Sequence, residues 1–261
     1  MANLVRLVGA YIKVNLAVAL EYRASMLSQV LGMCFNDLLW VMFWVLYFTK
    51  FPVLQGWTLE DVIVLWAAIP LSWGLVTGFF FNVVRLPALI TQGQLDYYLA
   101  LPKDVLVHVL ISQIRPLNLG DAVFGPVLLV VMVDLTWTKL LVYLTTALLA
   151  AMIWLGLYLL TGSLAFWLGH SEALSSQVIA TLLHISSYPM PIFDNTIKLL
   201  LFTVLPAGLI STLPVELVRA FHWQGFLQLM AGAVVFLGLG VLAFRRGLKR
   251  YESGNLLAMR S

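Results

Sequence analysis

Long apolar runs, separated by short polar segments, are the main pattern along this chain. A helix needs about 20 apolar residues to cross roughly 30 Å of hydrocarbon. The run at 140–168 is the clearest, because its 29 residues carry no formal charge. The pattern predicts an all-α membrane protein with six transmembrane helices. We expect them at about 26–48, 62–82, 117–133, 140–168, 173–188 and 224–244.

The N-terminal segment follows a different pattern. Within residues 1–24, apolar side chains recur at helical spacing and charged side chains lie between them, which indicates an amphipathic helix at the membrane interface. Lys13 stands where a signal peptide would have its apolar core. Residues 105–114 are also predicted to be interfacial, because Arg115-Pro116 interrupts the apolar stretch before the third crossing.

The segment 189–222 decides the number of crossings. Its prolines break the apolar pattern, so we expect it to lie on the outer side or to enter and leave the membrane as a re-entrant hairpin. Such a hairpin is either an outer lid or part of a pathway. A well-packed surface cap is the plainer alternative.

The basic residues favour six crossings, because cytoplasmic loops carry an excess of Lys and Arg. Six crossings put 11 of the 15 basic residues on one side, whereas a seventh would export the C-terminal cluster. We therefore expect both termini in the cytoplasm of a bacterium, with 245–261 as a cytoplasmic tail and the chain in the inner membrane. The 11 residues are Arg6, Lys13, Arg23, Arg85, Lys103, Arg115, Arg245, Arg246, Lys249, Arg250 and Arg260.

Composition excludes several classes of function. Hydrophobic residues make up 62% of the chain and charged residues 10%, against about a quarter charged in a typical soluble domain. The single cysteine, Cys34, and four scattered histidines suggest no metal site. No phosphate loop, HExxH helix or GxSxG elbow is present. We expect no catalytic residue, no cofactor in this chain and no nucleic-acid partner.

A structured loop is predicted at 83–104, between the second and third crossings, and we call it the elbow. It should be helical at Leu86–Ile90, turn at Gly93, resume near Asp96 and close at Pro102. It would present two aromatic side chains, Tyr97 and Tyr98, on a basic cytoplasmic surface. The elbow is therefore either a docking site for a partner or an ordinary folded loop.

One stripe of the first crossing carries polar and aromatic side chains at helical spacing. A carboxylate beside it, Asp37, would cost roughly 2.5–3.5 kcal/mol at bilayer depth, so it should face protein or water. The stripe indicates an amphipathic substrate pathway, or else helix packing with an aromatic belt at the outer interface. Its residues are Asn36, Trp40, Phe43, Trp44 and Tyr47.

Three smaller groups are assigned to packing in preference to function. Two glycines spaced as GxxxG should let another helix approach. A polar group that ends the fifth crossing is expected to bond neighbouring helices more than cargo, and an aromatic cluster is expected at the inner interface. These groups are Gly74 with Gly78, His184 with Ser186 and Ser187, and residues 79–82.

The elbow carries a pattern that resembles a known family. Ile90-x-x-Gly93-x-Leu95-Asp96-x-x-Leu99-x-x-Pro102 is similar to the loop of type-2 ATP-binding-cassette (ABC-2) exporter permeases. The ending Tyr251-Glu252-Ser253-Gly254-Asn255 is similar to that of one branch of the family. The resemblance covers nearly the whole chain, including the interfacial helix and the proline-broken piece.

The resemblance implies that 1–261 is a single permease domain that pairs with a second copy or a paralogue. Separate ABC ATPase subunits would bind ATP and Mg²⁺ and dock beneath it, and membrane lipid would surround it. The elbow and the N-terminal connector helix would form the coupling surface. The coupling residues would be Gly93, Leu95, Asp96, Tyr97, Leu99 and Pro102, with Arg6, Lys13 and Arg23 on the connector.

The expected function is ATP-driven export of an amphipathic substrate by alternating access, with Asn36, Asp37, Trp40, Phe43 and Trp44 along the pathway. One alternative is an ion-coupled secondary transporter. That class would show paired intramembrane acids and an inverted repeat, and neither is evident in the sequence. Another alternative is a membrane enzyme or assembly factor that acts on lipids.

Overall fold

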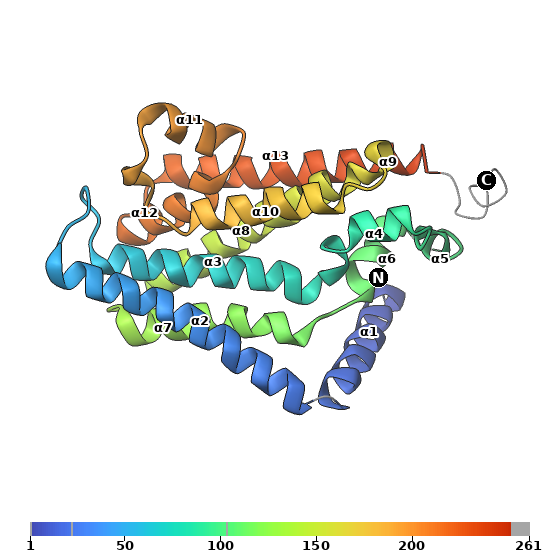
Figure 1. Cartoon of the computed structure of the whole chain (residues 1–261), viewed down its shortest axis with the longest axis horizontal. Helices are drawn as coiled ribbons and strands as arrows, with labels where there is room; N and C mark the ends of the chain where they lie inside the picture. The colour runs from blue at the N-terminus through green and yellow to red at the C-terminus, as the bar shows by residue number, and fades with distance from the viewer. Residues whose placement is uncertain (1, 22, 103, 252–261) are drawn as a thin grey trace.

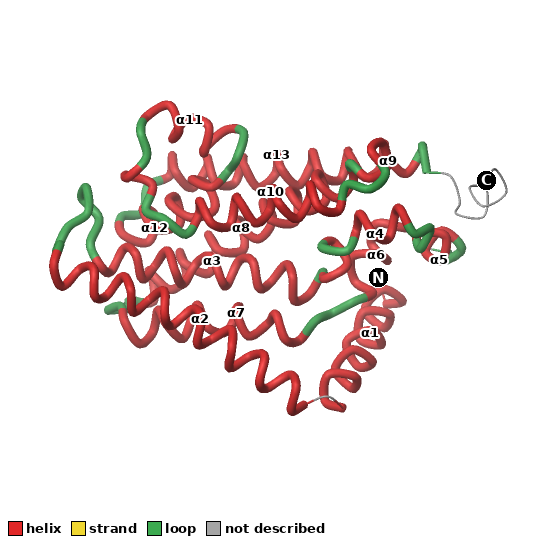
Figure 2. The backbone as a smooth tube through the Cα atoms, viewed as in Figure 1, coloured by secondary structure: helices red, strands yellow, loops and turns green. Residues whose placement is uncertain are grey.

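The chain folds into an elongated bundle of helices (Figure 1), and the computed structural model describes residues 2–21, 23–102 and 104–251. No strand occurs within those ranges, and most loops gather at the two ends of the bundle (Figure 2). The predicted all-α fold is confirmed. The longer helices that make up the bundle are α2 (Arg23–Lys50), α3 (Leu59–Phe79), α7 (Leu119–Met132), α8 (Trp137–Ser163), α10 (Glu172–Ser186) and α13 (Trp223–Leu248).

These helices differ in length. Among the described residues, four helical segments are long and apolar enough to cross a membrane: α2, α3, α13, and α8 continued by α9 (Ala165–Leu168). The fifth crossing was expected at 173–188, where α10 forms. With 15 residues in α10 and 14 in α7, these helices are only about 21–23 Å long.

Two pairs of shorter helices are also long and apolar enough to cross a membrane when the two helices of each pair are taken together. Helix α6 (Val105–Ser112) meets η2 (Pro116–Asn118) and α7 at a 73° bend, next to the predicted interruption at Arg115-Pro116. The second pair bends by 83° between α11 (Asn195–Thr203) and the segment that ends with α12. Counting each pair as one span gives up to six crossings in the described residues. This set does not contain α10, which occupies the predicted fifth crossing, and it contains instead the second bent pair, in the segment expected outside the membrane or as a re-entrant hairpin.

The proline-broken segment packs onto the bundle at the end opposite helix α1 (Figure 1). It contains η3 (Met190–Ile192), α11, the π-helix η4 (Gly208–Thr212) and α12 (Leu213–Arg219). Ile210 and Leu213 are buried against the apolar core that contains α8. At the end of α12, Arg219 Nε donates to Asp61 Oδ1 at 2.6 Å. Asp61 also accepts from the backbone N–H of Thr58, at the start of α3, at 2.8 Å. The Arg219–Asp61 pair therefore ties α12 to the start of α3.

The centre of the bundle depends on close approaches at glycines. A Cβ on Gly156 of α8 would collide with the backbone of Phe236 on α13, and one on Gly240 with the backbone of Gly156. The backbones of α8 and α13 therefore touch, as small residues allow in membrane helices. Gly74 and Gly78 of α3 also face α7, where a Cβ on Gly74 would meet the backbone of Ala122 and one on Gly78 the side chain of Leu119. Their predicted role in internal packing is confirmed.

The N-terminal helix α1 (Ala2–Glu21) runs obliquely to the bundle near the elbow (Figure 1). Its Asn15 Nδ2 donates to the carbonyl of Ser112 on α6 at 3.4 Å. The placement of Arg23 on this connector is wrong, because a new helix, α2, begins at that residue. The side chains of Arg6 and Arg23 lie outside the described part of the structure, as do Lys103 and the tail 252–261.

Candidate functional site

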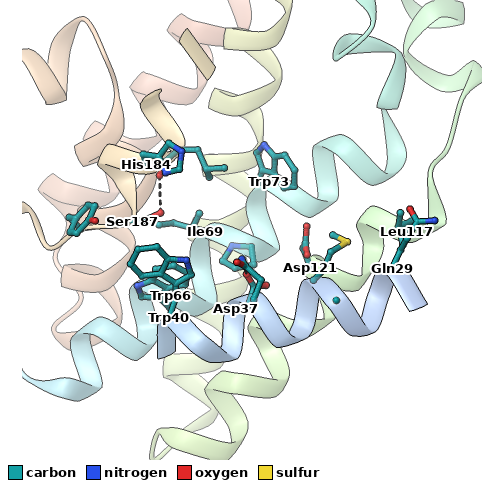
Figure 3. A pocket seen from close by; sticks show the side chains of 16 residues that line it. Gln29, Asp37, Trp40, Trp66, Ile69, Trp73, Leu117, Asp121, His184 and Ser187 are labelled. Carbon is teal, nitrogen blue, oxygen red and sulfur yellow. Dashed lines mark hydrogen bonds between the residues drawn. The ribbon is translucent and has the colours of Figure 1, made fainter. Parts of the chain in front are cut away.

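A cavity of about 550 Å³ lies between α2, α3, α10 and the start of α7 (Figure 3). We refer to it as the cavity. It brings together side chains from segments that are far apart in the sequence. Its polar lining is Gln29, Asn36, Asp37, Asp121, His184 and Ser187, and its aromatic lining is Trp40, Trp66, Trp73 and Tyr188.

Aromatic rings form much of the cavity wall. The rings of Trp40 and Trp66 stack with their centroids 5.6 Å apart and an angle of 19° between them. Trp73 donates from Nε1 to the hydroxyl of Tyr158 at 3.0 Å, which fixes the orientation of its indole. Pro70 lies between Trp66 and Trp73 on α3. Because proline has no backbone N–H, it cannot donate a hydrogen bond to the carbonyl of Trp66, four residues earlier. These rings make this part of the cavity wall apolar.

Two carboxylates face the cavity from different helices. Asp37 of α2 accepts from the Nδ2 of its neighbour Asn36 at 3.5 Å, a long and weak hydrogen bond. Asp121 of α7 is only 7% exposed. Among the described residues, no side chain forms a hydrogen bond or an ion pair with the Asp121 carboxylate. Asp37 is close enough for its charge to act on the Asp121 carboxylate.

The aromatic stripe predicted on α2 divides into two parts. Asn36, Asp37 and Trp40 line the cavity, as the pathway hypothesis proposed for them. Phe43 and Trp44 do not line it, so the cavity does not include these two predicted pathway residues. Trp44 is 4% exposed and packs in the core, with its ring centroid 6.4 Å from that of Tyr188. For Trp44 the structure supports the packing alternative.

The polar group at the end of α10 also differs from its prediction. Ser187 donates to the carbonyl of Leu183 within its own helix at 2.8 Å instead of bonding a neighbouring helix. His184 and Ser187 line the cavity, whereas Ser186 is fully buried. The sequence shows these groups but cannot show that α10 turns them toward α2 and α3.

The elbow forms a second candidate site, at the end of the bundle near α1 (Figure 1). It contains α4 (Leu86–Thr91) and α5 (Leu95–Leu99), and η1 (Phe81–Val83) leads into it from α3. Gly93 has a φ of +70° and makes the turn between α4 and α5, which a glycine adopts without strain. The predicted order of helix, turn and helix is confirmed. Helix α4 packs on α8, where Leu86 faces Gly162.

A buried hydrogen-bond network holds the elbow against α6. Asn82 is 2% exposed, and its Nδ2 lies 2.6 Å from Ser112 Oγ, 3.0 Å from the carbonyl of Val109 and 3.2 Å from the hydroxyl of Tyr98. The hydroxyls of Tyr98 and Ser112 are 3.0 Å apart. The expected place of Asn82 in an interfacial aromatic belt is therefore wrong. Its amide is the centre of this network.

The predicted coupling residues of the elbow fall into two groups. Tyr97 and Leu99 are 63% and 46% exposed, and the side chain of Pro102 is exposed too. Tyr98 was expected on the surface beside Tyr97, but this prediction is wrong because its ring is buried. Leu95 is fully buried as well, so it supports the elbow from inside and offers no surface.

Asp96 and Tyr251 connect the elbow to the end of α13. Burial raises the pKa of the Tyr251 hydroxyl, and the neighbouring Asp96 carboxylate raises it further. The Tyr251 ring packs edge-on against Phe166 of α9, with the ring centroids 6.1 Å apart. Asp96 therefore faces the last helix of the same chain as well as the turn at Gly93.

Helix α1 lies beside the elbow. Partial burial raises the pKa of Tyr11, and the neighbouring Tyr97 and Tyr98 add to the shift. Lys13 of the same helix is exposed. The structure thus brings α1 and the exposed tip of the elbow to one end of the bundle, which is also where α13 ends (Figure 1).

Comparison with known proteins places this architecture in a family. A family model described as "ABC-2 family transporter protein" matches residues 34–254. No curated protein and no solved structure matches the chain. The matched range begins within α2 and includes most of the cavity lining, the elbow and α13. The chain is a multi-pass transmembrane subunit, and it belongs to the ABC-2 family of transporter proteins.

Proposed function

We propose that this chain is the permease subunit of an ATP-driven exporter in a bacterial inner membrane. A second copy or a paralogue completes the pathway, and separate ATPase subunits that bind ATP and Mg²⁺ dock at the elbow. The end of the bundle with α1, the elbow and the end of α13 faces the cytoplasm. Arg245 and Arg246 lie in the last turn of α13, which fits the excess of basic residues in cytoplasmic segments.

The construction of the elbow is the observation that carries this proposal. Its exposed tip, with Tyr97 and Leu99, offers an apolar surface to a partner. Its base is fixed by the Asn82 network to α6 and by apolar packing to α8. A push on the tip is therefore passed to the helices around it. ATP-driven closure of a docked ATPase would supply the differential free energy that a two-state transporter needs.

Co-purification tests the docking surface. An ATPase with a phosphate loop, encoded beside this gene, is co-expressed with the chain and captured through it. Tyr97→Ala combined with Leu99→Asp should abolish capture, because both side chains are exposed and lie outside the Asn82 network. Trp223→Ala is the matched control, since Trp223 is 69% exposed on α13, which begins at the opposite end. Full capture and ATP hydrolysis in the double variant would overturn the assignment of the elbow.

Asp96→Lys is a poorer probe of docking than the sequence suggests. Asp96 interacts with Tyr251 of the same chain, so a lysine there would disturb the end of α13 as well as the surface. A loss of capture in that variant would not separate the two effects.

One observation favours the ion-coupled alternative. That class requires paired acids at membrane depth, and the structure brings Asp37 and Asp121 to one cavity. Transport in proteoliposomes separates the two functions. An ATP-driven exporter needs the ATPase and ATP and continues when an uncoupler abolishes the proton gradient. A secondary transporter works without the ATPase and stops with the uncoupler.

A further inference from the structure

The chemistry of the cavity indicates what it binds. We propose that the cavity is a site for an organic cation with an apolar body, held by the carboxylates of Asp37 and Asp121 between the tryptophan rings. This inference names a cargo class for the transport function proposed above, and so rests on it.

The buried carboxylate of Asp121 is the first step of the argument. It is 93% buried and lines the cavity, and no described side chain pairs with it. A carboxylate at membrane depth is costly and normally finds a partner in the protein or in a functional ligand. The ion pairs among the described residues involve neither Asp121 nor Asp37. Two like charges that face one cavity make a cation the favoured occupant.

A basic side chain of the adjoining groove is engaged elsewhere. Arg115 borders the adjoining groove, which shares Gln29 and Leu117 with the cavity. Its guanidinium lies 4.6 Å from the centroid of the Phe81 ring. No lysine or arginine lines the cavity in the described part of the chain. Among the lining residues, only His184 can carry a positive charge, so no lysine or arginine of the described residues neutralises the two carboxylates there.

The tryptophans select the kind of cation. Trp40, Trp66 and Trp73 present indole rings to the cavity, and the faces of indole rings attract desolvated cations. A metal ion would need several converging ligands, and no group of three or more His, Cys, Asp or Glu side chains in the described residues can hold one. A volume of about 550 Å³ suits a drug-sized molecule. The shared chemistry fits a free amphiphile or an amine-bearing lipid headgroup.

A pair of isosteric ions tests the proposal. Tetraphenylphosphonium and tetraphenylborate have similar size and apolar surface but opposite charge. Their binding to the purified chain in dodecyl maltoside is measured by equilibrium dialysis, with empty micelles as background. We expect saturable binding of the cation and at least about tenfold weaker binding of the anion. Equal binding of the two ions would overturn the proposal, because it would show apolar partitioning alone.

Neutral variants identify the carboxylates that are responsible. Asp121→Asn and Asp37→Asn should each weaken binding of the cation at least about tenfold. Asp134→Asn should not, because this carboxylate is exposed in the loop between α7 and α8, away from the cavity lining. Unchanged affinity in the first two variants would overturn the proposal.

A second pair of variants remains informative if the aspartate variants fail to fold. A Cβ on Gly32, which lines the cavity, meets no atom within 4 Å, and neither does one on Gly238 of α13. Gly32→Phe should therefore fill the cavity and abolish cation binding, whereas Gly238→Phe should leave it intact. An equal effect of both changes would contradict the assigned site.

Lipid competition and the ATPase partner complete the test. Competition by phosphatidylethanolamine but not phosphatidylglycerol would identify a headgroup amine as the ligand, and no competition by either would identify a free cation. Both outcomes support a cation site. Binding is measured without the ATPase, so a complex that transports but does not bind the cation overturns this inference alone. Charge-selective binding by a chain that captures no ATPase supports the site and overturns only the exporter.

Discussion

The elbow and the cavity both place polar side chains in apolar surroundings, but they satisfy them differently. In the elbow, the amide of Asn82 has three acceptors within 3.2 Å. In the cavity, Asp121 is 7% exposed, and its carboxylate has no bonding partner among the described residues. A buried polar group with partners stiffens the structure, whereas one without partners carries a cost that a ligand can remove. The comparison therefore distinguishes the elbow, which can pass a movement to the neighbouring helices, from the cavity, which can bind a ligand.

The largest stability change is expected when the elbow network loses its centre. Asn82→Leu removes the amide that donates to the carbonyl of Val109 and to two hydroxyls, which should cost on the order of 3 kcal/mol. The midpoint of unfolding by sodium dodecyl sulfate measures the change. Gln94→Leu is the matched control, because the amide of Gln94 donates only to the exposed Gln92. Equal losses in both variants would show that the network is not the stabilising element.

A smaller loss is expected when one member of the network is trimmed. Tyr98→Phe removes a hydroxyl that lies near Asn82 and Ser112 and keeps the buried ring, so about 1 kcal/mol should be lost. Tyr97→Phe serves as the comparison, since the Tyr97 ring is mostly exposed. The midpoint of unfolding by sodium dodecyl sulfate measures the stability of both variants. A Tyr98 variant as stable as the Tyr97 variant would contradict the network.

In the cavity, loss of a carboxylate should change the stability in the opposite direction. Asp121→Asn removes a desolvated charge and breaks no bond, so stability should stay the same or rise by up to about 1 kcal/mol. Asp61 gives the contrast, because it is equally buried but paired with Arg219. Asp61→Asn should therefore lower the unfolding midpoint. A comparable fall in the Asp121 variant would mean that its carboxylate has a structural role.

The smallest effect is expected at the rim of the cavity. The amide of Asn36 is exposed and reaches Asp37 only at 3.5 Å. Asn36→Ala should change the free energy of unfolding by less than about 0.5 kcal/mol. Its thermal midpoint should match that of the unmodified chain, and a clear shift would show that this weak bond orders the Asp37 carboxylate.

The parts of the fold that depend on local pattern could be predicted from the sequence. Apolar runs located α2, α3, α8 and α13, and glycine with proline located the turn at Gly93. Burial within short polar segments could not be predicted in this way. Tyr97 and Tyr98 are adjacent and alike, and only the position of α6 decides that Tyr98 faces Asn82. Asp37 was recognised as a candidate from its own helix. Its partnership with Asp121 depends on how α2 and α7 pack, which spacing along one chain does not encode.

The glycine contact between α8 and α13 limits how this protein can change shape. Because Gly156 and Gly240 bring the two backbones together without an intervening side chain, sliding or rotation between these helices would force main-chain atoms into one another. They can move only as one rigid body. Helix α2, which is largely exposed along its length, has the most freedom to swing, and it carries one wall of the cavity. Opening and closing of that wall therefore requires no rearrangement of the helices at the centre.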